Sequence, residues 1–437
     1  MMRSSLKYFK GYIIDKFSQL NLNEALLKAI DKQGFKTPTK IQRKIIPLLN
    51  KGVDVLAASK SGTGKTASYI LPMLNKINSN VNYQNRVLRG LILVPTRELV
   101  EQVSKTLADF GEFLKIKHTK IMGGSSRAKQ ISVLGGGVDI IVATSGRLLD
   151  LSRNQDLNLS SVNFIVLDEA DTMLEMGFLE EIEEIFSLCS PKRQIVMCSA
   201  TISQNIKKLG KEFLKNPVSV EVHDRRDKVE LIHHRAFKID KLKKKELVTK
   251  LIKDSNYDQI LLFVNKKEAA NGAIEHFKMH NVKAAAIHGE IEYKQRVQAI
   301  KDFRNKKIQV LIATDIAARG LDIEKLPLVI NYSLPESTDD FTHRVGRTGR
   351  AGNKGEVITI ITTEDYNHFT KIERELKLSV KREVHESFPL KDRQPRQKVQ
   401  TKKRLSEKKN RKEPIKKEPA KSKKTTKRDI KRNFRRK

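Results

Sequence analysis

The sequence predicts an α/β protein with two tandem, doubly wound parallel sheets and a basic, disordered C-terminal tail. Apolar strands alternate with helical stretches through residues 1–219, and after a polar linker at 220–230 the alternation restarts through residues 231–380. Such alternation is typical of parallel sheets with helices on both faces. Residues 381–437 contain 25 Lys or Arg against 7 Asp or Glu and few large apolar side chains, so we expect them not to fold alone.

The composition favours a nucleic-acid partner and argues against several other classes of protein. The 437 residues carry a formal net charge of +35, and because the body is basic as well as the tail, binding to a polyanion is favoured over a merely solvated tail. No apolar run approaches the roughly 18 residues of a membrane span, so we expect no membrane partner. Cys189 and Cys198 are too few for a metal cage or a disulfide framework, which makes a reducing cytoplasm the expected location.

The most informative stretch is FIVLDEAD, residues 164–171. Phe164 to Leu167 is predicted to be a strand buried on both faces, and its carboxyl end delivers Asp168, Glu169 and Asp171 within four positions. Ligands of open parallel sheets bind at the carboxyl ends of strands. A cluster of acids there requires a cation, which a bound phosphate group can help to hold.

A phosphate-binding loop is predicted at SKSGTGKT, residues 59–66, because it follows an apolar strand, Val53 to Ala58, and opens a helix. Gly62 and Gly64 allow backbone N–H groups to approach phosphate oxygens closely. The charge of Lys65 suits the β- and γ-phosphates, and the Thr66 hydroxyl can ligate Mg²⁺.

A second short segment, GFKTPTKIQ at residues 34–42, lies upstream of the loop. It follows a helix predicted at Leu22 to Lys32; Pro38 stops any helix before it, and Thr39 can cap the next one. Taken alone, Gln42 is an ordinary helix residue. With a phosphate loop close behind, it is a candidate to face a base, because an amide can donate to and accept from the N6/N7 edge of adenine.

Other predicted strands of the first half end in polar or glycine-rich segments. These are PTREL at 95–99, Gly123-Gly124, TSGR at 144–147 and SAT at 199–201. Each alone could be an ordinary loop. Their recurrence at strand ends predicts a surface that holds a phosphate backbone through N–H, O–H and guanidinium contacts.

The second half has no phosphate loop, but it has two distinctive segments, TDIAARGLD at 314–322 and HRVGRTGR at 343–350. Arg344, Arg347 and Arg350 recur every three residues beside two glycines, a pattern that a helix face explains poorly. We interpret them as fingers aimed at a triphosphate. The predicted strands of this half are Ile232–Ile239, Gln259–Val264, Val282–Ile287, Ile308–Ala313, Leu328–Tyr332 and Glu356–Ile361.

Together these segments resemble a DEAD-box ATP-dependent RNA helicase, in order from about Phe17 to Gly355, and the spacing and tail are most similar to the bacterial RhlE-type branch. The resemblance implies two RecA-like domains with ATP in the cleft and single-stranded RNA across both. It implies catalytic roles for Lys65, Glu169 as the base that deprotonates water, and Arg347 and Arg350 as arginine fingers. Asp168 would reach Mg²⁺ through water, with Thr66 as a further metal ligand.

The resemblance also implies binding and coupling residues. For ATP these are Phe17, Phe35, Gln42, Ser61, Gly62, Thr63, Gly64, Lys65, Thr66, Asp168 and Asp315. For RNA they are Pro95, Thr96, Arg97, Gly123, Gly124, Thr144, Arg147, Thr314, Arg319 and Gly320. Asp171, Ser199, Thr201 and His343 would couple the domains.

Four positions depart from the family pattern. Ser59 stands where the family usually has Ala, Ser145 replaces a Pro, and Phe341 replaces a common Tyr. Tyr293 stands where HGxxxQxxR has Gln, so Arg296 is carried over but the contact of the Gln is not. None of these changes removes a group needed for hydrolysis.

The function implied is RNA-stimulated ATP hydrolysis that unwinds or remodels RNA duplexes and RNA–protein complexes locally. Ribosomal precursors or the RNA-degradation machinery would suit such a family as partners. Two alternatives stay open on the sequence alone: a nucleotide-gated RNA-binding or annealing scaffold, and a DNA helicase, because backbone contacts distinguish RNA from DNA only through the 2′-hydroxyl.

Overall fold

The computed structural model describes most of the chain between residues 14 and 390. The described residues are 14–59, 62–79, 82, 84–222, 232–318, 321, 323, 326–349 and 355–390. All of them belong to one compact unit, Met1–Arg393. Most of the predicted linker and residues 391–437 of the predicted tail lie outside the described residues.

The described N-terminal half contains a seven-stranded parallel sheet with the order β3-β4-β2-β5-β6-β1-β7. Its strands are β1 (Val55–Ser59), β2 (Gly90–Leu93), β3 (His118–Ile121), β4 (Ile140–Ala143), β5 (Phe164–Leu167), β6 (Gln194–Ser199) and β7 (Val218–Val222). Its helices are η2 (Phe17–Leu20), α1 (Glu24–Lys32), α2 (Lys40–Asn50), α3 (Lys65–Asn78), α4 (Arg97–Gly111), α5 (Arg127–Gly135), α6 (Ser145–Arg153), α7 (Ala170–Glu175), α8 (Leu179–Leu188) and α9 (Gln204–Phe213).

The described C-terminal half repeats this topology, with the strand order β10-β11-β9-β12-β13-β8-β14. The strands are β8 (Ile232–Lys238), β9 (Ile260–Phe263), β10 (Ala284–Ile287), β11 (Val310–Ala313), β12 (Leu328–Asn331), β13 (Gly355–Ile361) and β14 (Arg382–Glu383). The helices are η3 (Lys241–Lys243), α10 (Lys244–Asp254), α11 (Lys267–Met279), α12 (Tyr293–Arg304), α13 (Asp315–Ala318), α14 (Thr338–Val345) and α15 (Tyr366–Leu376). The two strand orders are the same, with β8 in the place of β1, β9 in the place of β2, and so on to β14 in the place of β7. The predicted restart of the strand and helix pattern is therefore confirmed.

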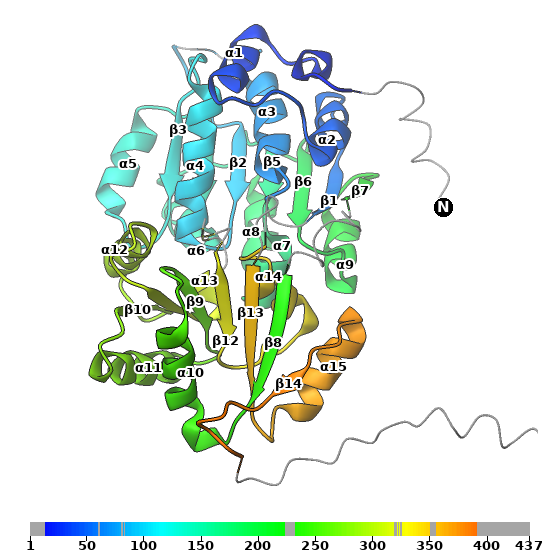
Figure 1. Ribbon diagram of the computed structural model, residues 1–437. Coiled ribbons are helices and arrows are strands. Elements are labelled where there is room, and N and C mark those ends of the chain that lie inside the picture. Colours follow the sequence, from blue (N-terminus) through cyan, green and yellow to red (C-terminus); the bar gives the residue numbers. More distant parts are fainter. Residues whose placement is uncertain are drawn as a thin grey trace, which may run out of the picture. The chain divides into compact units, whose positions relative to one another are not determined.

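Helices cover both faces of each sheet (Figure 1). The central strand β5 shows why its sequence is apolar throughout: Phe164 and Val166 belong to one core cluster, whereas Ile165 and Leu167 belong to the other. Successive residues of a strand point to opposite faces, so a strand covered on both sides needs apolar residues at every position. This is the doubly wound α/β architecture that the sequence predicts.

The strand order sets the sequence motifs in a row along one edge of the N-terminal sheet. From β1 outward, the carboxyl ends of neighbouring strands carry the phosphate loop, SAT after β6, the acids after β5, PTREL after β2, TSGR after β4 and Gly123-Gly124 after β3. Because the strands are parallel, these segments share one edge. The predicted nucleotide motifs therefore occupy one half of the edge and the predicted RNA motifs the other.

Two predicted boundaries differ from the structure by a few residues. Strand β7 pairs with β1 as far as Val222, so the first sheet extends past the boundary predicted at 219. Strand β14 pairs with β8, and Phe388 packs against a C-terminal core cluster, so the second sheet extends past 380. Both strands lie at an edge of their sheet, and β14 has only two residues.

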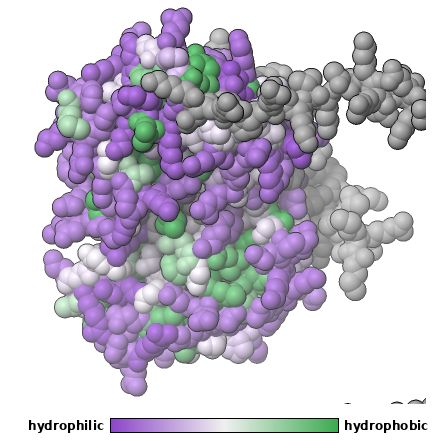
Figure 2. All heavy atoms as spheres, turned by 90° about the horizontal axis from the view of Figure 1, so that it is seen from below, coloured by the Kyte–Doolittle hydropathy of each residue, from purple (hydrophilic) through white to green (hydrophobic). Residues whose placement is uncertain are grey.

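The face of the molecule seen from below is largely polar (Figure 2). Figure 2 shows hydrophilic residues over much of the face seen from below, with hydrophobic residues gathered in patches. Among the described residues, none of the helices is both long and apolar enough to cross a bilayer.

Candidate active site

The phosphate loop has the backbone conformation that its glycines permit. Gly62 and Gly64 have φ angles of 74° and 87°, in the left-handed region that favours glycine. A Cβ at Gly64 would also lie 2.6 Å from Nε2 of Gln42. Gly64 caps α3, whose free N–H groups and dipole favour an anion at this point. Ser61 lies outside the described residues.

Lys65 and Thr63 are held by the strand ends around them. The ammonium group of Lys65 donates to the backbone oxygen of Ser59 and, at 3.1 Å, to that of Ser199. The hydroxyls of Ser59 and Thr63 are hydrogen-bonded at 2.7 Å. The Ser59 departure therefore adds a hydroxyl that contacts the loop, and Lys65 lies where the ends of β1 and β6 meet.

Gln42 joins the upstream segment to the loop. It is buried at the start of α2, where its side-chain oxygen accepts a 2.9 Å hydrogen bond from the backbone N–H of Thr39. Its Nε2 donates to the backbone oxygen of Gly64 at 3.2 Å. Thr39 caps α2 as predicted. Phe17 and Phe35 lie nearby in sequence and line a separate cavity of about 430 Å³.

Asp168 is buried and has two hydrogen-bond donors. The hydroxyl of Tyr69 donates to its Oδ2 at 2.8 Å, and the backbone N–H of Glu169 donates to its Oδ1 at 2.9 Å. Burial raises the pKa of Asp168, and the charge of Lys65 opposes this shift. The side chain of Thr66 hydrogen-bonds to Tyr69, so Tyr69 connects the two predicted metal-binding residues. Tyr69 belongs to none of the sequence motifs; its one signal is its position four residues after Lys65 on α3.

Glu169 combines a strained backbone with an unusual carboxyl group. Its φ of 51° and ψ of 48° place a non-glycine residue in the left-handed region at the start of α7. Burial raises its pKa to about 7, with a further increase from Asp168 and a decrease from Arg347. Its Oε2 atom is buried without a hydrogen-bond partner among the described residues. A carboxyl group with such a pKa can accept a proton near neutral pH.

Asp171 joins the acidic segment to SAT. Its Oδ2 accepts a 2.8 Å hydrogen bond from the backbone N–H of Ala200, and its Oδ1 accepts one from Thr172 N. The Ser199 hydroxyl donates to the backbone oxygen of Thr201 at 2.6 Å. The ends of β5 and β6 are therefore connected directly.

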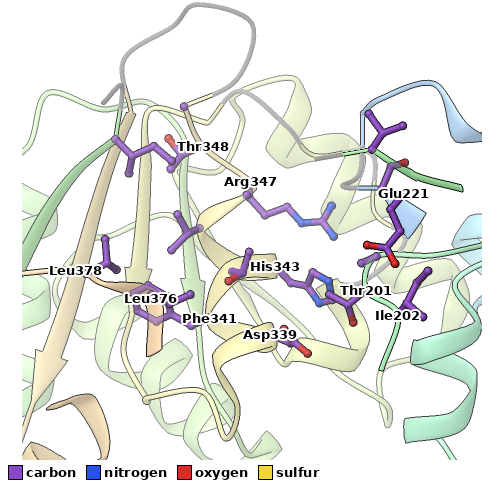
Figure 3. Close-up of a pocket in the computed structure, with 18 of the residues that line it drawn as sticks. Thr201, Ile202, Glu221, Asp339, Phe341, His343, Arg347, Thr348, Leu376 and Leu378 are labelled. Atoms are coloured by element: carbon purple, nitrogen blue, oxygen red, sulfur yellow. The ribbon is translucent and has the colours of Figure 1, made fainter. Parts of the chain in front are cut away.

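Arg347 lines a cavity of about 560 Å³, together with other residues from both halves of the chain. In Figure 3 the side chain of Arg347 points toward the side of Glu221 and Thr201, and His343 lies beside Thr201. Arg347 is buried, donates to the backbone oxygen of Leu321 at 2.6 Å, and lowers the pKa of Glu169 by its charge. Arg350 lies outside the described residues.

Arg344 corrects one prediction. It is not a finger toward a triphosphate, because only 1% of its surface is exposed and its guanidinium forms two hydrogen bonds of 2.6 Å with the carboxylate of Asp315. It also donates to Asn265 Oδ1 at 2.9 Å. The residue sits on α14 with its side chain directed into the domain. Asp315, predicted to approach a ribose, has Arg344 as its partner.

Most of the predicted RNA residues line one further cavity of about 370 Å³. It includes Pro95, Thr96, Arg97, Gly123, Thr144 and Arg147. Gly124 lies against the guanidinium of Arg97. Arg147 donates to the backbone oxygen of Ser125 at 3.2 Å and thereby braces the segment after the glycine pair. Thr314 does not line this cavity, and Arg319 and Gly320 lie outside the described residues.

The same cavity contains an ion pair between the two halves. Arg296 of α12 contacts Glu98 of α4 at 3.0 Å, and their side chains are 14% and 8% exposed. Arg296 is expected from the family pattern, whereas its partner Glu98 is not predicted from the sequence. This shielded pair links α4 of the N-terminal domain to α12 of the C-terminal domain.

These features define a class: a nucleoside triphosphatase of two tandem RecA-like domains, with its phosphate loop and acids in one domain and an arginine of the other domain close to them. Residues 39–209 match the model of the DEAD/DEAH box helicase family, and residues 243–352 match that of the helicase conserved C-terminal domain.

Individual proteins that are similar to this chain belong to the same family. The DEAD-box ATP-dependent RNA helicase RhpA of Helicobacter pylori is 35% identical over 84% of this chain and 73% of its own length. The corresponding values for CshA of Streptococcus pneumoniae are 36%, 85% and 71%. The solved structure of S. cerevisiae Dbp5 bound to RNA and ADP BeF3 matches with a TM-score of 0.76 and 30% identity, over 85% of this chain and 96% of that one. The chain belongs to the DEAD-box family and is an ATP-dependent RNA helicase.

Proposed function

We propose that this helicase hydrolyses ATP with a base from one domain and an arginine clamp from the other. Glu169 takes the proton of the attacking water, Lys65 neutralises charge on the phosphates, and Arg347 and Arg350 stabilise the charge that develops on the transferred group. An arginine finger contributes about 10³–10⁵ in rate. The observation that carries the proposal is Glu169, a carboxyl group with a pKa of about 7 that lies within the electrostatic reach of Arg347.

The protein residues alone offer too few ligands for Mg²⁺, so the ion fits this site only when it is bound together with the nucleotide. Among the described residues, no group of three or more His, Cys, Asp or Glu could hold a metal ion. Asp168 offers one buried carboxylate, and Thr66 a hydroxyl connected to it through Tyr69. Mg²⁺ commonly binds through one or two carboxylates, substrate phosphates and water. When bound it supplies positive charge to the phosphates, while Asp168 and Thr66 hold it in place.

We propose that residues beside the phosphate loop bind the base and the ribose of ATP. We assign the adenine to Gln42, with Phe17 and Phe35 supporting its pocket, and the ribose to Asp315. Gln42 already contacts the loop through Gly64, which supports a base close to the phosphate site. The hydrogen bonds of Asp315 to Arg344 fix its carboxylate in one orientation.

RNA binds across both domains in this account. In the N-terminal domain, the cavity lined by Arg97, Thr144 and Arg147 supports the assignment of the sugar–phosphate backbone to this region. Backbone contacts position a strand without reading its sequence, so binding should be largely independent of sequence and include single strands and duplex ends. Gly124, Thr314, Arg319 and Gly320 complete the proposed contacts.

ATP hydrolysis and RNA binding are coupled, because each of them requires both domains. RNA that touches both domains favours their association, and association brings Arg347 to the phosphates; by linkage, RNA then stimulates hydrolysis. Asp171, Ser199, Thr201 and His343 are the proposed coupling residues. The hydrogen bond from Ala200 to Asp171 supports this, since it ties the acidic segment to SAT at the cavity that His343 lines.

Cellular placement is part of the proposal. The two cysteines are buried free thiols, which suits a reducing cytoplasm. Ribosomal precursors or the RNA-degradation machinery are the proposed contexts. Membership of the RhlE-type branch remains a prediction. So do the domain divisions at 219, 231 and 380, which β7 and β14 shift by a few residues.

The discriminating experiment compares ATP hydrolysis with matched single-stranded RNA and DNA of one sequence. We expect RNA to stimulate turnover strongly and DNA weakly, because some contacts should require the 2′-hydroxyl. Equal stimulation would favour a DNA-directed enzyme. Binding of ATP and RNA without any stimulated turnover would favour the scaffold alternative.

A further inference from the structure

Tyr293 is a residue of the C-terminal domain that packs against the N-terminal domain. It begins α12, and its ring packs against the core cluster that α1 to α4 form with one face of the N-terminal sheet. The centre of the ring is 5.9 Å from Cζ of Arg97, the first residue of α4. This distance lies within the roughly 6 Å over which a guanidinium and an aromatic face attract each other.

The Arg97 guanidinium also lies against bare backbone, that of Gly123 and Gly124. A Cβ built on Gly123 would lie 3.3 Å from Nη2 of Arg97. One built on Gly124 would overlap Nη1 and lie 3.1 Å from Cζ, at a φ of +77° that already disfavours other residues. The glycine pair therefore provides the space that this guanidinium fills. Arg97 therefore lies close both to the glycine backbone of its own domain and to a ring of the other domain.

The phenol of Tyr293 is neutral in this environment. Burial raises the pKa of Tyr293 to about 12, with smaller increases from Glu101 and Glu98 and decreases from Arg97 and Arg296. The phenol is therefore protonated at physiological pH. The ion pair of Glu98 with Arg296 lies at the same junction, so that much of the surrounding charge is already paired.

We propose that Tyr293 is a positioning residue through which the C-terminal domain holds Arg97 in the orientation that receives the RNA backbone. The inference rests on the proposed RNA contact of Arg97. Tyr293 stands where the family pattern has Gln, so an aromatic face replaces an amide at this junction. The strength of RNA binding by Arg97 then depends on whether the C-terminal domain is in contact, and this ties RNA binding to domain association.

The test measures the RNA concentration that gives half-maximal stimulation of ATP hydrolysis by the full chain. Tyr293→Leu keeps apolar bulk but removes the aromatic face, and we expect about a 3- to 30-fold increase in that concentration. Tyr293→Phe keeps the face and should change it by less than about twofold. Val297→Ala, one turn along α12 at a position 43% exposed, is the matched control. Equal effects of Tyr293→Leu and Tyr293→Phe, or no effect of either, would overturn the proposal.

A double-mutant cycle with Arg97→Ala separates this inference from the proposed function. If Tyr293 acts through Arg97, Tyr293→Leu adds little to a chain that already lacks the arginine. Fully additive effects would show that the ring acts elsewhere and would overturn the inference alone. If Arg97→Ala by itself leaves the half-maximal RNA concentration unchanged, the proposed RNA contact fails and the inference fails with it.

Discussion

The hydroxyl of Tyr69 donates a 2.8 Å hydrogen bond to Oδ2 of Asp168, although the two residues are 99 positions apart. The bond connects the helix that follows the phosphate loop with the end of the strand that carries the acids. It orients one carboxylate oxygen and opposes the rise in pKa that burial causes. The carboxylate that we propose to hold Mg²⁺ is thus positioned by a residue that no phosphate-loop pattern includes.

Tyr69→Phe tests this role. Loss of the hydroxyl removes a donor to a buried carboxylate and raises the pKa of Asp168 further, so the carboxylate should hold Mg²⁺ less well. We expect the Mg²⁺ concentration for half-maximal hydrolysis to increase by about 3- to 30-fold, and by more at lower pH. Tyr257→Phe, whose hydroxyl donates to Glu356 outside the site, is the control. An unchanged Mg²⁺ requirement in Tyr69→Phe would refute the role.

The pH dependence of kcat/KM for ATP should report the carboxyl group of Glu169. A base with a pKa of about 7 in the free protein must be deprotonated to act. At saturating RNA, kcat/KM should therefore fall about tenfold per pH unit below pH 7 and level off above it. Because the charge of Arg347 lowers this pKa, Arg347→Gln should move the residual profile to higher pH. A flat profile between pH 6 and 8 would contradict the assignment.

Arg344 should matter chiefly for the stability of the C-terminal domain. Removal of one partner of a buried, hydrogen-bonded ion pair costs about 3–5 kcal/mol, because the other partner stays buried without its counter-ion. We expect Arg344→Met to lower the free energy of unfolding of that domain by this amount, measured by denaturant unfolding of the full chain. Arg374→Ala, at an exposed position of α15, should change it by less than about 0.5 kcal/mol. Equal stabilities of the two variants would exclude the structural role.

The basic residues at 391–437 should contribute sequence-neutral affinity for RNA. Each Lys or Arg that contacts a single-stranded phosphate contributes roughly 0.7 to the slope of log affinity against log salt. Deletion of these residues should weaken RNA binding and flatten that slope, as measured by fluorescence anisotropy between about 50 and 200 mM salt. Hydrolysis without RNA serves as the control. If deletion leaves the slope of log affinity against log salt unchanged, residues 391–437 do not hold RNA through its phosphates.

The sequence was most informative where one short stretch carries both an element and its chemistry. FIVLDEAD predicts its strand and the acids at its end, and the structure places β5 at Phe164–Leu167 as expected. The phosphate loop is equally local, since its glycines must adopt positive φ angles between β1 and α3. The fold class followed from repetition of such stretches.

Contacts between distant residues could not be predicted in this way. Arg344 belongs to a regular run of arginines, but its partner Asp315 lies 29 positions away, and only packing decides that the side chain turns inward. The pair of Glu98 with Arg296 and the contact of Tyr293 with Arg97 join different domains. No periodicity in the sequence encodes such a meeting.

The central claim is that catalysis needs the base of one domain beside the arginine of the other. Single-turnover phosphate release by Glu169→Gln, at saturating ATP and RNA, tests it most directly, with Glu212→Gln at an exposed position of α9 as the control. We expect Glu169→Gln to bind both ligands with nearly unchanged affinity and to release phosphate at least about 10²-fold more slowly. Undiminished release by Glu169→Gln would contradict it.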